Sequence, residues 1–199
     1  MKEDWSNVTN EMMAQLFPII LEPHNPSWGT YYLEEKEFLQ SVFGSHIIRI
    51  SHIGSTSVMA LLAKPTIDIL LEISEDTDLE SITKQLTEKG YNVNYAKKDI
   101  ITFIKGYTPR GVEGQTYHIH VRHSGDWGEL YFRDYLILHT DIARKYETLK
   151  KDLREKFLHD REGYTEAKGQ FINECTNKAR IEFPDRYTPA ICRKNRKII

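Results

Sequence analysis

Apolar residues recur at helical spacing in several stretches of the chain. This pattern predicts amphipathic helices over residues 28–43, 79–90, 130–139, 142–157 and 164–183, and a short helix over 10–17 that Pro18 stops. Gly44 is expected to end the helix at 28–43, and Ser27 to cap its start. Thr77-Asp-Leu-Glu80 matches a capping box, in which Thr77 caps the next helix. The chain beyond Trp127 is therefore predicted to be helical.

Runs of β-branched and alternating residues predict a mixed sheet of about five strands. The expected strands cover residues 47–53, 66–73, 91–95, 99–105 and 116–122. Residues 66–73 form a nearly continuous apolar run, which is typical of a strand buried on both faces. Residues 116–122 alternate, so His118 and His120 share one face of their strand. We also expect residues 19–21 to pair at the sheet edge, and residues 106–115, with three glycines and Pro109, to form a mobile loop.

The most informative stretch leads from the first expected strand into the second. Gly54-Ser-Thr-Ser57 offers hydroxyls and backbone amides that are suited to hold a phosphate. Residues 57–63 are apolar and compatible with a short helix, which Pro65 would close. Asp68 then interrupts the apolar run. A carboxylate in a buried strand is costly unless it is paired, hydrogen-bonded or bound to metal, so Asp68 is a candidate for metal binding or acid–base chemistry.

Size and composition set broad bounds. The chain has 199 residues, of which 40% are hydrophobic and 28% charged, and this suits one globular domain. Within it we assign residues 1–125 to an α/β core, 126–183 to a helical part packed on that core, and 184–199 to a basic tail. The net charge of −2 gives no strong signal for nucleic acid or for a membrane. The absence of an apolar signal region, and two cysteines without metal-type spacing, favour a cytoplasmic location with free thiols.

The order of these elements resembles the nucleotidyltransferase superfamily, whose pattern is a strand, Gly-Ser, a short helix and a strand bearing Asp-x-Asp or Asp-x-Glu. The chain resembles the GrpB-like family more closely, because several segments match in the same order across roughly residues 18–180. These segments are Leu21-Glu-Pro-His-Asn-Pro-Ser-Trp28, His52-Ile-Gly-Ser-Thr-Ser57, Lys64-Pro-Thr-Ile-Asp68, His118-Ile-His-Val121, Phe132-Arg-Asp-Tyr-Leu136, Tyr146-Glu-Thr-Leu-Lys150 and Tyr164 to Phe171.

The resemblance implies a nucleotidyltransferase-like α+β fold, with a mixed sheet of about five strands, packed helices and a helical C-terminal half. Two positions depart from the pattern. Leu70 stands where the superfamily has its second carboxylate, and Met59-Ala-Leu61 stands where the family usually has Pro-Gly-Leu. Glu72 lies roughly 13 Å from Asp68 in an extended strand, so it cannot simply replace the missing carboxylate.

Asp68, His118 and His120 are the candidate catalytic and metal-binding residues. If their strands are neighbours, one carboxylate and two imidazoles form the site, which admits Mg²⁺ and favours Zn²⁺, Mn²⁺ or another transition ion. The alternatives are an Asp68 paired with Arg49 or Lys64, and histidines that only hydrogen-bond to neighbours. The candidate substrate-binding residues are Gly54, Ser55, Thr56, Ser57, Lys64, Arg133 and Lys168, with Lys150 as a further anion contact.

Three functions remain open at this point. The first is an enzyme that transfers a nucleotidyl group from an NTP with a divalent cation. The second, which Leu70 favours, is a non-catalytic module that binds a nucleotide or another phosphorylated small molecule. The third is an interaction protein with a closed cleft at Asp68. No P-loop, dinucleotide fingerprint or Ser-His-Asp elbow is present, and the sequence does not determine the acceptor, the nucleotide or the oligomeric state.

Overall fold

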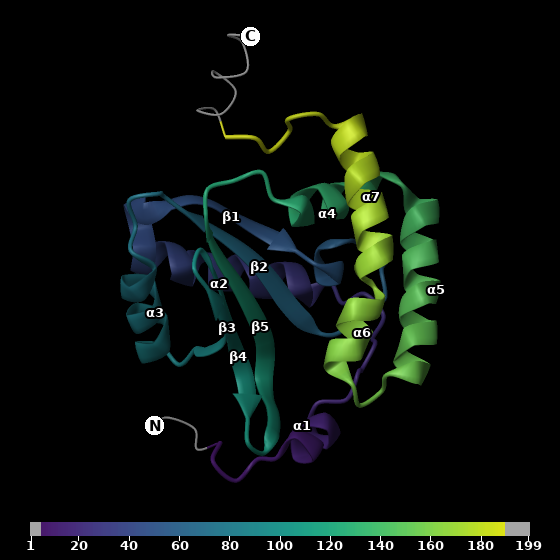
Figure 1. Cartoon of the computed structure of the whole chain (residues 1–199), viewed down its shortest axis with the longest axis horizontal. Coiled ribbons are helices and arrows are strands. Elements are labelled where there is room, and N and C mark those ends of the chain that lie inside the picture. Colours follow the sequence, from purple (N-terminus) through teal and green to yellow (C-terminus); the bar gives the residue numbers. More distant parts are fainter. Residues whose placement is uncertain (1–4, 190–199) are drawn as a thin grey trace.

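A five-stranded mixed sheet lies at the centre of the computed structural model, which describes residues 5–189. The strand order is β1-β2-β5-β4-β3 (Figure 1). The strands are β1 (Ile47–Ile53), β2 (Thr66–Ile73), β3 (Asn92–Lys97), β4 (Ile100–Thr108) and β5 (Gly111–His123). β2 and β5 are parallel, and the other neighbouring pairs are antiparallel. The predicted α+β class with a mixed sheet of five strands is confirmed.

Most helices form two groups on opposite sides of this sheet, and the first short helix lies apart from them, beside the end of the β4–β5 hairpin (Figure 1). They are α1 (Asn10–Leu16), α2 (Ser27–Phe43), α3 (Leu79–Glu88), α4 (Gly128–Leu138), α5 (Thr140–Lys156), α6 (Arg161–Ala167) and α7 (Gly169–Glu182). Helices α2 and α3 pack on one face, where the main apolar core contains Ile69 and Leu71 of β2. On the other face, Leu70 packs against Leu130 of α4. β2 is therefore buried on both faces, as its apolar run predicts.

The predicted helix over residues 57–63 is wrong. Residues Ser55–Ser57 form one 3₁₀ turn, and the chain then continues without helical structure to β2. Partners elsewhere in the fold satisfy the backbone groups of this segment. Ala63 exchanges two backbone hydrogen bonds with Glu22, and the Leu62 amide donates to Glu147 of α5. A segment whose amides and carbonyls bond to distant elements gains little from an isolated helical turn.

The predicted loop over residues 106–115 is also wrong, because β4 and β5 continue through it as a hairpin. Thr108 pairs with Gly111, so only two residues form the turn. Gly106 lies at a register shift with φ of +87°. A Cβ there would lie 2.5 Å from the Gln115 carbonyl oxygen, so this glycine permits a bulge and does not break the strand.

Three further local predictions, on two helix caps and on the pairing of residues 19–21, also differ from the structure. Ser27 is the first residue of α2 and makes no capping bond. Asp78, and not Thr77, caps α3 by accepting hydrogen bonds from two backbone amides. Residues 19–21 do not join the sheet, since the Ile19 amide donates to the Leu158 carbonyl beyond α5.

The C-terminal half is helical, but residues 164–183 belong to two helices that meet at Lys168. The residues Arg193, Lys194, Arg196 and Lys197, which define the predicted basic tail, and Cys192 lie outside the described residues. Among the described residues, no helix combines the length and apolar character needed to cross a membrane.

Candidate metal and phosphate site

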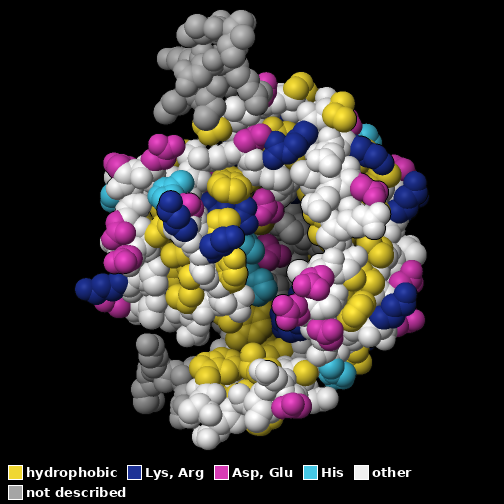
Figure 2. All heavy atoms as spheres, viewed as in Figure 1, with side chains coloured by type: hydrophobic (Ala, Val, Ile, Leu, Met, Phe, Trp, Pro, Cys, Tyr) yellow, Lys and Arg dark blue, Asp and Glu magenta, His cyan; other side chains and the backbone are white. Residues whose placement is uncertain are grey.

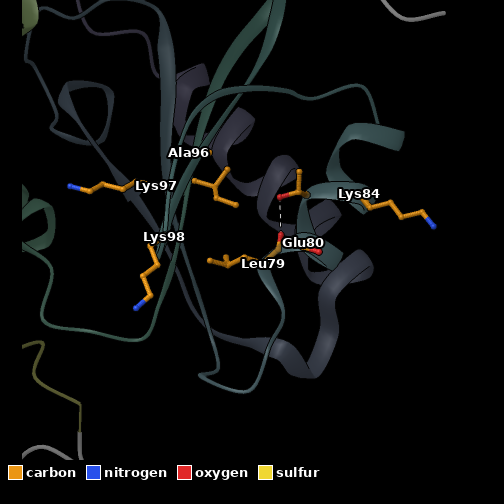
Figure 3. A pocket seen from close by; sticks show the side chains of 8 residues that line it. Leu79, Glu80, Lys84, Ala96, Lys97 and Lys98 are labelled. Atoms are coloured by element: carbon orange, nitrogen blue, oxygen red, sulfur yellow. Dashed lines mark hydrogen bonds between the residues drawn. The ribbon is translucent and has the colours of Figure 1, made fainter.

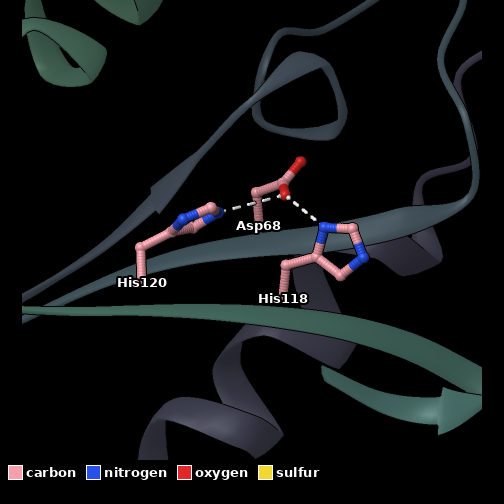
Figure 4. A group of neighbouring side chains, drawn as sticks. All are labelled: Asp68, His118 and His120. Atoms are coloured by element: carbon pink, nitrogen blue, oxygen red, sulfur yellow. Dashed lines mark hydrogen bonds and ion pairs between the residues drawn. The ribbon is translucent and has the colours of Figure 1, made fainter. Parts of the chain in front are cut away.

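Asp68, His118 and His120 meet on one face of the sheet. Asp68 lies on β2 and is directly paired with His118 on the parallel neighbour β5. Asp68 Oδ1 lies 3.3 Å from His118 Nδ1 and 3.5 Å from His120 Nε2 (Figure 4). One ligand atom from each residue lies within 4.8 Å of the other two. One carboxylate and two imidazoles at this spacing form a donor set suited to a transition metal ion.

The second nitrogen of each imidazole has its own hydroxyl partner. His118 Nε2 lies 3.0 Å from the Tyr107 hydroxyl, and His120 Nδ1 lies 3.4 Å from Thr102 Oγ1. When His118 carries its proton on Nε2, that N–H donates a hydrogen bond to the Tyr107 hydroxyl, and the lone pair on Nδ1 is available to an ion bound beside Asp68. Histidines that ligate metals are commonly oriented in this way by a partner on the far side of the ring.

The protonation states also suit a metal site. Burial alone would raise the pKa of Asp68, but hydrogen bonds and charge interactions with the two histidines outweigh it and hold the pKa of the carboxyl well below its usual range. Burial lowers the pKa of His118, although the nearby Asp68 partly offsets this effect. An ionised carboxylate beside a neutral imidazole is the combination that metal ligation requires.

Strand β2 carries two carboxylates, Asp68 and Glu72, and they have different surroundings. Glu72, and not Asp68, forms the ion pair with Arg49, and Glu72 is fully buried. Glu72 also accepts a hydrogen bond from the Gly125 amide, so its oxygens are occupied. The Asp68 side chain is 28% exposed and faces a cleft. Asp68 is therefore accessible to a ligand, whereas Glu72 is a structural residue.

The turn after β1 brings its backbone against Asp68. Gly54 has φ of +70°, and a Cβ at this position would lie 3.0 Å from Asp68 Cβ and Cγ. Two hydroxyls of the turn donate hydrogen bonds to backbone carbonyls of the protein itself. Thr56 donates to the Thr66 carbonyl, and Ser57 donates to the Gly54 carbonyl at 2.6 Å. Ser57 does not line the cleft, so Gly54, Ser55 and Thr56 are the residues of the predicted phosphate turn that do.

A cleft of about 1210 Å³ separates the Asp68 face of the sheet from the C-terminal helices. Figure 2 looks into this hollow, where histidine and acidic side chains are visible in its depth. β2, β4 and β5 form its floor, and residues of α4, α5, α6 and α7 form the facing wall. The third interpretation of the sequence expected a closed cleft at Asp68, and this opening does not favour it.

Three lysines from separate elements surround one end of this cleft. Lys64 precedes β2, Lys150 lies on α5, and Lys168 lies between α6 and α7. Lys64 and Lys168 lie over the ring of Tyr164, at 5.6 and 4.2 Å from its centroid. Lys150 is almost fully buried and donates to Ser55 Oγ at 3.2 Å and to the Leu62 carbonyl. None of the three forms an ion pair with a carboxylate of the described residues.

The clustering of these cations affects their charge. Burial, and in each case repulsion from a neighbouring cation, lower the pKa of Lys64 to about 8 and those of Lys150 and Lys168 to about 7. Asp68 acts in the opposite direction on Lys64 and Lys168. An anion bound among the lysines would relieve the repulsion, so this end of the cleft is suited to phosphate.

Arg133 is not brought to the cleft. Its guanidinium donates to the His52 carbonyl at 3.0 Å and to the Tyr187 hydroxyl, and it forms an ion pair with Asp134. These bonds connect α4 to the end of β1 and to the segment after α7. The position of Arg133 therefore fits a structural role, whereas the other predicted cation contacts, Lys64 and Lys168, line the cleft.

The sequence interpretation missed several residues that line the cleft. Arg161 donates to the Tyr107 hydroxyl at 3.3 Å and therefore lies behind His118. Trp5, Met13 and Phe17 of the N-terminal segment form an apolar wall next to Tyr107. No local pattern marks these residues, because they approach Tyr107 of β4 only through tertiary packing.

A second, smaller hollow of about 540 Å³ lies between α3 and the β3–β4 pair (Figure 3). Lys84, Lys97 and Lys98 line it, but Figure 3 shows their ammonium groups pointing in separate directions. The lysines do not converge, and Glu80 is the single carboxylate of the lining. This hollow therefore lacks the features of a site.

The fold and the cleft define an α+β protein with a carboxylate and two imidazoles at the floor of a partly cationic cleft. The chain belongs to the GrpB family, since the sequence model for "GrpB protein" matches residues 18–178. The predicted resemblance to this family is confirmed.

Individual relatives agree with this assignment. The glutamate-rich protein GrpB of Alkalihalophilus pseudofirmus is 33% identical over 165 residues, which are 80% of this chain and 95% of that protein. The UPF0157 protein PA4798 of Pseudomonas aeruginosa is 33% identical over 181 residues, covering 88% of this chain and 71% of the relative. The crystal structure of GrpB from Enterococcus faecalis superposes with a TM-score of 0.72 and 27% identity, over 82% of this chain and 99% of that one.

Proposed function

We propose that this protein binds a divalent metal ion at Asp68, His118 and His120 and, beside it, a nucleotide or another phosphorylated small molecule. The observation that carries the proposal is the convergence of three metal-type donor atoms within 4.8 Å at the floor of an open cleft. Buried structural histidines need no such opening, whereas a ligand site does. Two imidazoles favour Zn²⁺ or Mn²⁺ over Mg²⁺.

The lysine cluster supports a phosphorylated ligand. Lys64, Lys150 and Lys168 place three ammonium groups along one end of the same cleft, without carboxylates of the described residues in ion-pair contact. Phosphate oxygens would supply the missing counter-charge, and the backbone of the turn at Gly54 offers further donors. The phosphates of one ligand can then contact both the cation and the lysines.

Nucleotidyl transfer is the reaction that such an arrangement supports. A bound divalent ion would supply charge neutralisation at the phosphate oxygens. An acceptor oxygen forms a bond to the α-phosphorus, the bond to the bridging oxygen breaks, pyrophosphate leaves and the acceptor proton passes to water. Lys64 and Lys168 would hold the phosphates, while Asp68, His118 and His120 hold the ion.

A binding module without turnover is the second candidate, and Leu70 favours it. This side chain is fully buried in an apolar cluster with Ile53 and Leu130, and Glu72 is held in an ion pair with Arg49. β2 thus offers one accessible carboxylate for a cation, where a two-metal site needs more. The protein would then bind the metal and the phosphorylated ligand and release both unchanged.

Metal and nucleotide titrations of the full chain test the proposal. We expect Mn²⁺ or Zn²⁺ to bind with one equivalent per chain and ATP to bind only when the ion is present. Electron spin-echo measurements on bound Mn²⁺ should show coupling to imidazole nitrogen. Asp68→Asn keeps the shape of the side chain and should weaken metal binding at least tenfold, whereas Asp76→Asn in the loop after β2 should leave it unchanged.

The result that would overturn the proposal is an unmodified chain that binds neither ion nor nucleotide. Release of pyrophosphate from ATP in the presence of a panel of acceptors distinguishes the enzyme from the binding module. Product formation that disappears in Asp68→Asn supports transfer, while metal-dependent binding without product supports the module.

A further inference from the structure

We infer that the edge strand β3 supplies a subsite for a flat heteroaromatic ring, formed by Tyr95 and Asn94 at the end of the cleft away from the lysines. The inference rests on the proposed function and makes it more specific, because it identifies the ligand as a nucleotide and assigns the residues that contact its base.

A row of paired residues leads from the metal ligands to this strand. His120 on β5 is paired with Thr102 on β4, and Thr102 is paired with Tyr95 on β3. Directly paired residues on neighbouring strands have side chains on the same face of a sheet. The contact between Thr102 Oγ1 and His120 Nδ1 places Thr102 on the metal face, so Tyr95 lies on that face too. Three strand spacings separate β2 from β3, which is about 14 Å.

A bulge turns two consecutive side chains of β3 towards the cleft. In a regular strand, neighbours point to opposite faces, yet Asn94 and Tyr95 both line the cleft. The register of β3 against β4 shifts between Val93 and Tyr95, which places Asn94 at the bulge. Bulges commonly redirect a side chain in this way next to binding sites.

Both side chains are available for a ligand. Tyr95 is 52% exposed, and no other aromatic ring of the described residues packs against it. The Asn94 amide makes no hydrogen bond with the described residues, so its donor and its acceptor are both free. Ile104, which is paired with His118 on the intervening strand β4, adds an apolar surface to the same floor. This end of the cleft therefore offers one exposed ring, one free amide and an apolar surface.

A single ligand that fills both ends of the cleft must have different chemical groups at its two ends. The lysine end suits phosphate, whereas Tyr95 offers a face for stacking and Asn94 can hydrogen-bond to the edge of a ring. A nucleotide combines an anionic chain with a flat ring that carries donors and acceptors. Stacking of a base on an aromatic side chain improves affinity by roughly five- to 150-fold.

Calorimetric titration of the full chain with Mn²⁺ present tests the subsite with two ligands, ATP and inorganic tripolyphosphate. We expect ATP to bind more tightly than tripolyphosphate. Tyr95→Ala should weaken ATP binding about fivefold or more and leave tripolyphosphate binding unchanged, while Tyr95→Phe should retain the affinity for ATP. Val93→Ala is the matched control, because Val93 is an exposed residue of the same strand that does not line the cleft.

Asn94→Ala provides a second measurement. It should change the ratio of affinities for purine and pyrimidine triphosphates without affecting tripolyphosphate. The subsite is refuted when ATP and tripolyphosphate bind equally well to the unmodified chain, or when Tyr95→Ala weakens the binding of both alike. In either case, metal-dependent binding of tripolyphosphate would still support the proposed function. If neither ligand binds, the proposed function fails and the subsite fails with it.

Discussion

Asp68 and His118 occupy directly paired positions on the two parallel strands of the sheet, with Asp68 Oδ1 at 3.3 Å from His118 Nδ1. Helix α3 and the strands β3 and β4 separate these two strands along the chain, so the pairing is a product of the whole fold. Because both side chains project from paired backbone positions, hydrogen bonds between strands fix their separation. The candidate metal ligands are thus positioned by two central strands of the sheet and not by loops.

The turn at Gly54 should not tolerate a side chain. A Cβ would meet Asp68, and φ of +70° disfavours any L-residue, so Gly54→Ala should lower the free energy of unfolding by about 1–3 kcal/mol and also weaken metal binding. Urea unfolding and a metal titration measure the two effects. Gly29→Ala is the control, since nothing lies within 4 Å of its added methyl and it should leave metal binding unchanged. Equal metal affinity of Gly54→Ala and the unmodified chain would contradict the proposed geometry.

The Tyr107 hydroxyl should orient His118 for metal binding. Tyr107→Phe removes the group 3.0 Å from His118 Nε2, and loss of such a partner typically costs about 10- to 100-fold in metal affinity. Tyr91→Phe is the matched control, because the Tyr91 hydroxyl is buried without a hydrogen-bond partner among the described residues. We expect that change to leave metal affinity unaltered and stability equal or higher. Identical titration curves for both variants would contradict the role of Tyr107.

Because of Lys168, the free energy of unfolding should rise as the pH is raised above 7. Burial first, and the charge of Lys64 second, lower the pKa of Lys168 from 10.5 to about 7. Between pH 7 and 10.5 the unfolded chain therefore binds more protons at this site than the folded chain, and the free energy of unfolding rises with pH. Lys168→Met should flatten this rise, so its stability relative to the unmodified chain should be greatest near pH 7.

Urea unfolding at pH 7, 8.5 and 10 provides the measurement. Lys145→Met, at a side chain that is 68% exposed, serves as the control and should keep the slope of the unmodified chain. A slope that Lys168→Met leaves untouched would show that the lysine is not held in a charge-disfavouring environment.

Leu70 should be needed for the stability of the fold and not for binding of the metal ion. It is fully buried between Ile53 and Leu130, so Leu70→Ala should lower the free energy of unfolding by about 2–5 kcal/mol. The stoichiometry of metal binding should remain one ion per chain under conditions where the variant is folded. Chemical unfolding and a titration of the folded variant test both statements; loss of the ion together with a normal unfolding midpoint would contradict them.

Part of the candidate site can be predicted from short stretches of sequence. The alternation of residues 116–122 places His118 and His120 on one face, and the polar interruption of an apolar run marks Asp68. The Gly54 turn is recognisable because it follows a strand and contains consecutive hydroxyls. These inferences hold because side-chain direction within one strand depends only on local backbone geometry.

The contacts of other residues depend on partners that their local sequence does not reveal. The hydroxyl of Ser57 bonds within its own turn, and the amide of Leu62 bonds to Glu147 of α5. Arg133 has the charge expected of a phosphate contact but bonds to the end of β1 and to Tyr187. Arg161 resembles a surface charge in the sequence and lies behind His118 in the fold.

The sequence by itself determined most of the helices and strands, the family, and the chemical character of the β2 and β5 faces. Periodicity and turn residues carry this information because they act over a few neighbouring positions. Only the tertiary structure decided that β2 and β5 are neighbours, that the C-terminal helices bring lysines to one end of the cleft, and that Glu72 rather than Asp68 neutralises Arg49. Those outcomes depend on how the apolar faces of sheet and helices pack together, which no local pattern specifies.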